Sequence, residues 1–354
     1  MPQRLLPEGI YTPLPTFFLP GSEDLDLNAL RQHVVFVAKA GTIPVLAGSA
    51  GEAPHLLAAE RITLIKTARA ALDDAGLREA VIVAGVGAPS TRETIQLACD
   101  AADAGADFAM VLPSGYYAGQ LQAKNSQPLR QFFIDVAHAS PLPVILYNFP
   151  GVSAGINLDS DLIVDVARAC PNVVGVKLTC ANVGKVTRIT ALLDDPAFKQ
   201  AYPRISVTGG DSNEAAQQQP FQVIDGYIDI LLPSMASGAA GAISGLPNVA
   251  PYLCMKLWTL ASESRGRALA KDDTDYREAQ RLQRLVALAD GVAAKIGIAG
   301  LKMLVYRCRG YGGALPRRPL VPMEAAEGDA VMADEHIRRV MEEEAKLVGA
   351  AVLP

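Results

Sequence analysis

The residue with the clearest chemical potential is Lys177, which closes the apolar run Val173-Val174-Gly175-Val176-Lys177-Leu178-Thr179. An amine in a largely apolar setting is poorly solvated in its charged form, so it can act as a nucleophile near neutral pH. Such an amine can form an imine with the carbonyl group of a 2-oxo acid. A lysine at a strand end is also commonly a solvated side chain leaving the core, so the run alone leaves both interpretations open.

A tyrosine stands at the end of another apolar run earlier in the chain. Tyr147 opens the segment Tyr147-Asn148-Phe149-Pro150-Gly151, and 177 − 147 = 30 residues separate it from Lys177. This spacing corresponds to one strand and helix, which predicts that the two residues lie on adjacent strands at the same end. A phenol hydroxyl at that place can carry protons, although an inward tyrosine can also merely fill a core.

A loop of small residues, Gly48-Ser49-Ala50-Gly51-Glu52, follows the short apolar run 43–47. Small side chains let backbone N–H groups approach an anion, and a substrate carboxylate would suit such a loop. A plain turn that uses glycine for its conformation is the alternative. For Glu52, the one charged member, we expect a structural hydrogen-bonding role.

These residues fall within a regular alternation of short apolar runs and helical patterns. The predicted strands are 11–18, 43–47, 80–84, 108–112, 143–147, 173–177, 205–208 and 241–244, and the predicted helices between them are 27–40, 58–74, 91–104, 128–139, 159–169 and 183–193. Eight strands joined by helices imply parallel crossovers, which predicts an α/β fold, a (β/α)₈ TIM barrel. In such a barrel, reactive groups lie on the loops after the strands.

The pattern changes to helices alone beyond about residue 257. The candidate helices are 275–288, 292–307 and 334–349, and the linker-like pieces are 119–127 and 213–222. We therefore expect residues 1–256 to form the barrel with the active site and residues 257–354 to form a C-terminal helical appendage packed on it.

Composition excludes several classes of protein. Hydrophobic residues make up 50% and charged ones 19%, which suits a large buried core and argues against disorder. The net charge of −5 gives no reason to expect a nucleic-acid or membrane partner. A charge-free segment between Asp229 and Lys256 is interrupted by prolines and glycines, so buried barrel elements explain it better than a membrane helix.

Neither a metal nor an exported protein is expected. Five scattered cysteines show no metal-ligand or disulfide spacing, and the four histidines are far apart in the chain. The first residues lack both the apolar stretch of a signal peptide and the pattern of a transit peptide, so a cytoplasmic location is expected.

The ordered set of motifs resembles the dihydrodipicolinate synthase / N-acetylneuraminate lyase family of class I aldolases. The Gly48–Glu52 loop, the tyrosine turn at residues 147–150 and the run that ends in Lys177 carry the resemblance. It is extended by Gly209-Gly210-Asp211, Gly241-Ala242-Ile243-Ser244 and Leu315-Pro316-Arg317-Arg318-Pro319-Leu320, so that it covers roughly residues 9–322.

The resemblance implies a metal-independent and cofactor-free enzyme in which a lysine forms an imine with pyruvate or a pyruvate-containing substrate. It makes Lys177 the imine-forming lysine and Tyr147 the proton-transfer residue. Ser49 and Ala50 take the positions that hold the 2-oxo acid carboxylate, and Ser49 keeps a hydroxyl for a proton relay. Further substrate-binding positions are Thr179, Gly210, Ile243 and Ser244.

Assembly is also implied by the resemblance. Tyr116 and Tyr117 match a tyrosine pair whose second member, here Tyr117, commonly reaches into a neighbouring subunit's site. A homodimer or homotetramer is therefore expected.

Two departures from the family pattern narrow the substrate. Dihydrodipicolinate synthases usually carry an arginine where this chain has Val152, and an aliphatic side chain cannot hold a second carboxylate in a bidentate contact. Thr179 places a hydroxyl two positions after the lysine, as in sugar-acid aldolases, and Ser153 and Ser244 are further candidate hydroxyls. These features favour a hydroxylated 2-oxo acid, such as 4-hydroxy-2-oxoglutarate or a 2-keto-3-deoxy sugar acid, cleaved to pyruvate and an aldehyde.

Two alternatives remain open at this point. A dihydrodipicolinate synthase or a sugar-acid dehydratase would use the same lysine imine with a different outcome. A non-catalytic barrel that binds a metabolite belongs to another class, and it predicts decay of the site residues, whereas the lysine and the tyrosine are both present.

Overall fold

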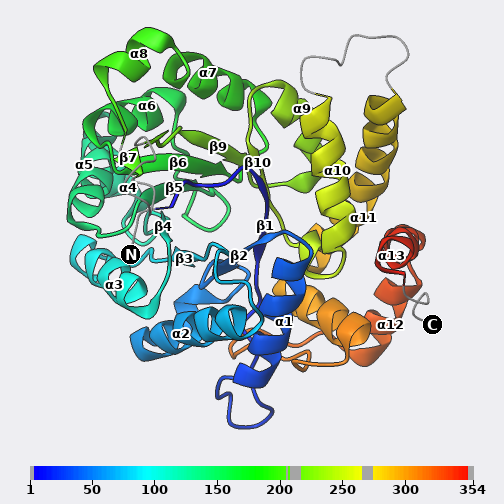
Figure 1. The fold of residues 1–354 in the computed structure, drawn as a ribbon. Helices are drawn as coiled ribbons and strands as arrows, with labels where there is room; N and C mark the ends of the chain where they lie inside the picture. Colours follow the sequence, from blue (N-terminus) through cyan, green and yellow to red (C-terminus); the bar gives the residue numbers. More distant parts are fainter. Residues whose placement is uncertain (1–3, 205, 208–216, 265–273, 350–354) are drawn as a thin grey trace. The chain divides into compact units, whose positions relative to one another are not determined.

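Eight strands close into a barrel, which confirms the predicted (β/α)₈ architecture. The computed structural model describes residues 4–204, 206–207, 217–264 and 274–349. The strands follow the order β1-β10-β9-β6-β5-β4-β3-β2 around the barrel (Figure 1). Their bounds are β1 (Gly9–Pro13), β2 (Ile43–Leu46), β3 (Val83–Gly85), β4 (Phe108–Val111), β5 (Val144–Asn148), β6 (Val173–Leu178), β9 (Gln222–Asp225) and β10 (Gly241–Ile243).

Helices connect most of the strands, as parallel pairing requires. They are α1 (Leu27–Lys39), α2 (Ala58–Asp74), α3 (Thr91–Ala104), α4 (Ala118–Leu121), α5 (Ala123–Ala139), α6 (Ser160–Ala169), α7 (Val183–Leu193), α8 (Pro196–Ala201) and α9 (Leu231–Ala236). Short 3₁₀ turns occur at η1 (Ala53–His55), η2 (Ile228–Ile230) and η3 (Leu246–Asn248). The structure confirms the helices predicted at 58–74, 91–104 and 183–193 with the same bounds.

The chain forms two compact units. The first unit comprises Met1–Glu8, Val81–Gly226 and Ala236–Gly241, and the second comprises Gly9–Ala80, Tyr227–Met235 and Ala242–Pro354. In the first unit, β3 to β6 and β9 pair in parallel, and every residue of β6 is buried. Burial on both faces explains why this strand is an almost continuous apolar run.

Two helices of the first unit, α3 and α6, begin at a residue whose side chain caps the first turn. Ser90 accepts the backbone N–H of Glu93 at the start of α3 (3.2 Å), and Asp159 accepts that of Leu162 at the start of α6 (2.7 Å). Each cap satisfies an N–H group that has no partner inside its helix, and this fixes where the helix begins.

The predicted seventh barrel strand, 205–208, is wrong. Ser206–Val207 forms β7, which pairs antiparallel with β8 (Gln217–Gln218) in a separate two-stranded sheet. The barrel strand is β9, which begins at the end of the predicted linker 213–222. Two buried glutamines in this segment have the backbone of Leu6 as a hydrogen-bond partner: Gln219 accepts its N–H (2.9 Å), and Gln222 donates to its carbonyl (3.4 Å).

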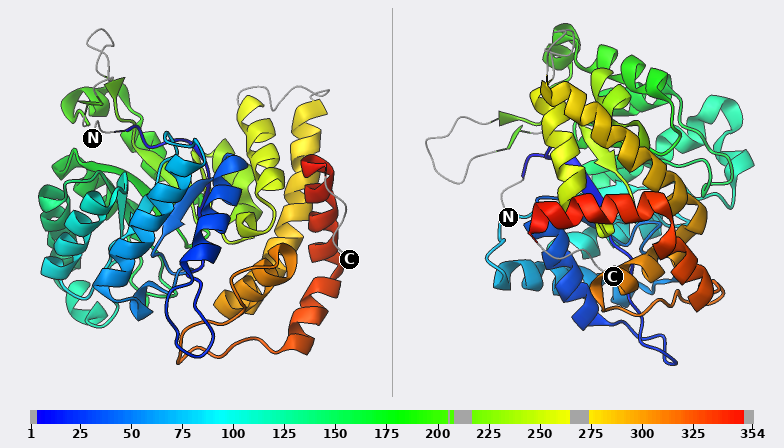
Figure 2. Two further views of the ribbon diagram at one scale, coloured as in Figure 1. Left: turned by 60° about the horizontal axis from the view of Figure 1, so that its bottom comes forward. Right: turned by 90° about the vertical axis from the view of Figure 1, so that its right-hand side faces the viewer.

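The C-terminal helices of the second unit pack against one another. They are α10 (Pro251–Glu263), α11 (Thr274–Arg309), α12 (Ala325–Ala333) and α13 (Glu335–Val348), and Figure 2 shows α13, in red, crossing α10 and α11. The buried carboxylate of Glu344 in α13 accepts the N–H groups of Tyr252 (3.2 Å) and Leu253 (2.7 Å) in the first turn of α10. One helix thus caps another. The division of the chain at residue 256 stays a prediction.

The structure has one helix, α11, where the sequence predicted two helices at 275–288 and 292–307. Ala289 and Asp290 between them are buried and remain helical, and the backbone departs from helical geometry only at Gly297 (φ 61°, ψ −156°). In the part of the chain that the structure describes, no helix is long and apolar enough to cross a bilayer.

His33 of α1 is buried in a hydrogen-bonded chain of side chains. Asn248 donates its amide hydrogens to the carbonyls of Pro13 (3.1 Å) and Gly245 (2.8 Å), so its oxygen must accept from His33 Nε2 (2.9 Å). His33 Nδ1 is then the acceptor for the Tyr311 hydroxyl at 3.0 Å. The neutral imidazole is therefore the form that fits, and burial lowers the pKa of His33 to about 4.

This lowered pKa predicts a loss of stability in acid. A histidine whose pKa falls from 6.5 to about 4 on folding contributes stability that is complete above pH 6.5 and disappears as the pH falls toward 4. We expect the free energy of unfolding of the wild type to lose about 3 kcal/mol relative to His33→Gln over this range. Urea titrations of both proteins at pH 7.5, 5.5 and 4.5 measure this difference. Equal pH slopes for the two proteins would contradict it.

Candidate active site

Tyr147 and Lys177 are direct neighbours across the pair formed by β5 and β6. Strand β6 lies between β5 and β9 (Figure 1). Tyr147 and Lys177 are register partners, and Lys177 pairs in register with Ile224 of β9 on the other side. Both side chains are almost fully buried, with 3% of Tyr147 and 6% of Lys177 exposed. The Lys177 Nζ lies 4.1 Å from the centre of the Tyr147 ring. The adjacency predicted from the spacing of 30 residues is thus confirmed.

This arrangement can perform nucleophilic and proton-transfer chemistry at one place. An amine can act as a nucleophile, and a phenol beside it can carry protons. Burial by the apolar strands keeps bulk water away from an imine. Parallel register places the two side chains next to each other on regular strands and not on loops.

Thr179, directly after β6, supplies a hydroxyl with no hydrogen-bond partner among the described residues. Its N–H donates to the carbonyl of Asn148 (2.8 Å), and only 6% of the residue is exposed. A Cβ at Gly226 would lie 2.2 Å from the Thr179 Oγ1, so only glycine allows this close approach. A buried hydroxyl without a partner suits a polar group of a ligand.

The turn after β5 is held by its own polar side chains. The Asn148 amide donates to Asn157 Oδ1 (3.0 Å), and its oxygen accepts the N–H of Leu158 (2.9 Å). Ser153, a candidate hydroxyl for the substrate, is fully buried, and its hydroxyl donates to the carbonyl of Phe149 at 2.8 Å. Val152 is 48% exposed, so this position presents an aliphatic side chain to solvent.

The predicted tyrosine pair stands on the surface of the first unit. Tyr116 is 84% exposed and Tyr117 is 57% exposed, and their rings make an edge contact at 4.9 Å between centroids. Gly115 lets the pair rest on the turn after β5, because a Cβ there would lie 2.9 Å from the backbone of Ser153. Two exposed aromatic rings suit a surface that a partner covers.

The loop Gly48–Glu52 lies in the second unit, where Ser49 and Ala50 are half-buried. The expected structural role of Glu52 is confirmed, because its buried carboxylate accepts Lys302 Nζ at 2.5 Å and the N–H of Arg317 at 2.8 Å. The Arg317 guanidinium in turn makes a bidentate pair with Glu60 at the start of α2 (2.7 and 2.8 Å). These contacts lower the pKa of Glu60.

Ile243 and Ser244, at the end of β10, are both buried. The Ser244 hydroxyl donates to Asp290 Oδ1 of α11 at 3.0 Å. Burial raises the pKa of Asp290 to about 6; the Ser244 hydroxyl opposes this shift, and the nearby Asp229 adds to it. Because the Ser244 proton is directed to Asp290, its oxygen remains able to accept a hydrogen bond.

Asp290 predicts a pH effect opposite to that of His33. An acid whose pKa rises from 3.8 to about 6 on folding contributes stability that is complete below pH 3.8 and is lost as the pH rises through 6. Asp290→Asn should therefore gain roughly 3 kcal/mol in free energy of unfolding over the wild type between pH 4 and pH 7.5. Urea titration at the two pH values tests this. A difference between variant and wild type that does not change with pH would count against it.

The structure brings together only part of the predicted site within one unit. Tyr147, Lys177 and Thr179 lie on or beside β5 and β6 of the first unit, and Tyr117 belongs to the same unit. Ser49, Ala50, Ile243 and Ser244 belong to the second unit. Gly210 lies outside the described residues.

We did not predict from the sequence that Asp290 contacts Ser244 or that Lys302 contacts Glu52. Asp290 and Lys302 are each a single charge within an apolar stretch of α11, and 0% of Lys302 and 6% of Asp290 are exposed. An isolated charge in an otherwise apolar helix was the available signal, because such a charge is rarely buried without a partner.

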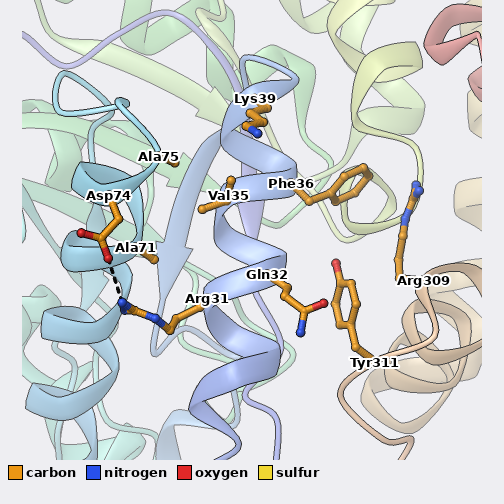
Figure 3. A pocket seen from close by; sticks show the side chains of 10 residues that line it. All are labelled: Arg31, Gln32, Val35, Phe36, Lys39, Ala71, Asp74, Ala75, Arg309 and Tyr311. Atoms are coloured by element: carbon orange, nitrogen blue, oxygen red, sulfur yellow. Dashed lines mark hydrogen bonds and ion pairs between the residues drawn. The ribbon is translucent and has the colours of Figure 1, made fainter.

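A surface hollow of about 590 Å³ lies over α1 in the second unit. Figure 3 shows Arg31, paired with Asp74, on one side of α1, and Phe36, Gln32, Tyr311 and Arg309 on the other. It includes no predicted site residue, and the guanidinium of Arg309 is already placed over the Phe36 ring at 3.9 Å. The described residues contain no group of three or more metal-ligating His, Cys, Asp or Glu side chains.

Comparisons with known proteins confirm the family resemblance. The profile of the Dihydrodipicolinate synthetase family matches residues 6–198. The L-threo-3-deoxy-hexylosonate aldolase of Aspergillus niger is 39% identical over 352 residues, which cover 98% of this chain and 99% of the relative. An Emericella nidulans protein named "Probable 4-hydroxy-2-oxoglutarate aldolase, mitochondrial" is 38% identical over 332 residues, or 94% of each chain.

A solved structure of a similar protein has the same fold. A dihydrodipicolinate synthase family protein from Coccidioides immitis superimposes with a TM-score of 0.76 at 35% sequence identity. The match covers 99% of this chain and 100% of the other.

Proposed function

The chain belongs to the Dihydrodipicolinate synthetase family, and from this premise we propose that it is a class I aldolase. It cleaves a 4-hydroxy-2-oxo acid reversibly to pyruvate and an aldehyde. The observation that carries the proposal is the buried register pair of Tyr147 and Lys177, with the amine 4.1 Å from the ring centre. The names of the two aldolase relatives support the reaction type.

The reaction begins at the amine of Lys177. Its Nζ attacks C2 of the 2-oxo acid, and loss of water gives the imine, which draws electrons from the neighbouring bond. The C3–C4 bond then breaks, its electron pair moves into an enamine, and Tyr147 takes the proton of the C4 hydroxyl with help from Ser49 or water. The aldehyde leaves, C3 is reprotonated, and water hydrolyses the imine to release pyruvate and the free lysine.

The remaining site residues hold the substrate. On the strength of the motif order, we assign the carboxylate to Ser49 and Ala50, whose small side chains allow an anion to approach the backbone closely. Thr179 contacts a substrate hydroxyl, which is supported by its buried and unpartnered Oγ1. Gly210, Ile243 and Ser244 complete the substrate-binding positions.

The substrate is a hydroxylated 2-oxo acid, either a 2-keto-3-deoxy sugar acid or 4-hydroxy-2-oxoglutarate. The first is supported by the Aspergillus niger relative and the second by the Emericella nidulans relative. A dihydrodipicolinate synthase or a sugar-acid dehydratase with the same imine is the alternative. The aliphatic Val152 argues against the synthase, because it offers no cation for a second carboxylate.

Borohydride trapping followed by a substrate comparison tests this function. The protein is incubated with pyruvate, and borohydride is added to reduce any imine to a stable amine. Its peptides are then analysed by mass spectrometry, and we expect a pyruvyl adduct on Lys177. Coupled assays then compare a 2-keto-3-deoxy sugar acid, 4-hydroxy-2-oxoglutarate, and pyruvate with aspartate semialdehyde. Absence of the adduct refutes the imine, and activity with the semialdehyde alone refutes the aldolase. A trapped adduct also excludes the non-catalytic barrel.

Three further properties belong to the same proposal. The enzyme needs no metal or organic cofactor, because the imine itself supplies the electron sink. It assembles as a homodimer or homotetramer in which Tyr117 reaches a neighbouring site, which its exposure supports. It works in the cytoplasm, although the Emericella nidulans relative is named mitochondrial, and localisation of a fluorescent fusion would decide between the compartments.

A further inference from the structure

A second lysine, Lys302 of α11, is completely buried beside the loop Gly48–Glu52. Its Nζ donates to Glu52 Oε1 at 2.5 Å and to the carbonyl of Leu315 at 2.8 Å. The same nitrogen lies 4.3 Å from the centre of the Phe18 ring. Burial lowers the pKa of this amine, and the Glu52 carboxylate opposes the shift. With these partners around it, the amine is placed to hold Glu52 in position.

Glu52 is held from more than one side. Its second carboxylate oxygen accepts the N–H of Arg317 at 2.8 Å, and His55 Nδ1 lies 3.3 Å from the same oxygen. Only 1% of Glu52 is exposed. Both Lys302 and Arg317 come from the C-terminal part of the chain, so that part directly fixes the last residue of the loop.

The backbone of the loop needs such support. Ala47 before the loop and Glu52 at its end have φ values of 50° and 56°, in the left-handed region. This conformation costs a residue other than glycine on the order of 1 kcal/mol and persists only where surrounding contacts hold it. The Thr16 hydroxyl adds one contact to the carbonyl of Gly51 (2.7 Å), and the N–H of Glu52 adds another to the carbonyl of Ser49 (3.1 Å).

We propose that Lys302 is a positioning residue for the substrate carboxylate: it fixes Glu52 and thereby the backbone N–H groups at Ser49 and Ala50. The inference rests on the proposed function. A buried ion pair can often be replaced by apolar residues without loss of stability, so the pair is weak as a source of stability alone. Its value lies in orienting the loop, and removing both charges together should loosen the loop while leaving the core filled.

The test compares the double variant Lys302→Met/Glu52→Gln with the wild type. Each protein is incubated with pyruvate, or with its neutral analogue pyruvamide, and the Lys177 adduct is trapped with borohydride at increasing ligand concentration. For the double variant we expect the half-saturating pyruvate concentration to rise roughly tenfold, because a carboxylate contact is lost. The value for pyruvamide should stay within about twofold, and kcat at saturating substrate should change much less than KM.

A matched control keeps the comparison specific. Arg281→Met/Glu278→Gln removes an exposed ion pair of the same helix (2.7 Å), and it should leave both ligands unaffected. Glu52→Gln alone keeps Lys302 and its carbonyl contact, and it should show the same selective loss to a smaller extent. Near-ultraviolet circular dichroism is recorded for both variants, and the ligand comparison is made with each variant that keeps the wild-type spectrum.

The outcomes separate the two proposals. If the half-saturating concentrations of pyruvate and pyruvamide rise equally, Lys302 has a general structural role and the inference is overturned. An unchanged half-saturating pyruvate concentration in a folded variant also overturns it. Absence of a wild-type adduct overturns the aldolase proposal itself and the inference with it. A selective loss for pyruvate, with the wild-type adduct present, supports both.

Discussion

Replacing Lys177 with methionine is expected to abolish cleavage, with a fall in kcat of roughly 10⁴-fold or more. Methionine keeps the length and apolar packing of the side chain but cannot form an imine. Because only 6% of Lys177 is exposed, a methionine of similar length should keep this buried position filled and the fold intact. Steady-state assay of the variant, with borohydride trapping in parallel, measures the effect.

A second buried lysine of the first unit provides the control for this result. Lys185 of α7 is 4% exposed, and its amine donates to Asn157 Oδ1 (2.7 Å) and to the carbonyl of Leu158. Burial lowers the pKa of Lys185, so a trapped adduct could in principle form there. We expect Lys185→Met to keep the pyruvyl adduct and Lys177→Met to lose it. The reverse pattern would transfer the imine to Lys185.

The adjacency of Tyr147 and Lys177 could be predicted because it depends on local periodicity. One strand and one helix occupy 30 residues in this part of the chain, and parallel register then places both residues at one level. The helices α2, α3 and α7 could be predicted from the same kind of local pattern, because their ends and their apolar faces depend on residues close together in the sequence.

The seventh strand could not be predicted in this way. β9 contains the buried polar residues Gln222 and Asp225, and the Gln222 side chain is satisfied by Leu6, 216 residues away. A polar residue with a distant partner looks the same in sequence as one in a linker. The nearby pattern at 205–208 has the expected apolar residues, and the structure pairs its middle with β8 instead.

The contact between Glu52 and Lys302 was beyond prediction for the same reason. The two residues are 250 positions apart, and only the packing of α11 brings the amine to the loop. Candidate substrate-contacting residues could be proposed from the sequence because they follow the ends of predicted strands. The partners of Glu52 could not be proposed in this way, because a buried ion pair between distant residues depends on tertiary packing.

Replacing Tyr147 with phenylalanine is expected to lower the rate of cleavage by roughly 10²- to 10⁴-fold, the usual contribution of one acid–base group. The substitution keeps the ring that lies 4.1 Å from Lys177 Nζ and its contact with Phe149, whose centroid is 5.9 Å away. Only the hydroxyl is lost, so the geometry of the amine is preserved. Steady-state assay at saturating substrate gives the change in kcat.

The variant also separates imine formation from bond cleavage. If Tyr147 takes the proton of the C4 hydroxyl, the variant should still form the pyruvyl adduct, and exchange of the pyruvate C3 protons in D₂O should fall much less than cleavage. Tyr116→Phe is the matched control, because that ring is 84% exposed and its loss of a hydroxyl should leave kcat within about twofold. If Tyr147→Phe cleaves the substrate as fast as the Tyr116→Phe control, Tyr147 does not carry the proton. Equal losses of exchange and cleavage would instead place its hydroxyl at C3, where it would control the enamine step.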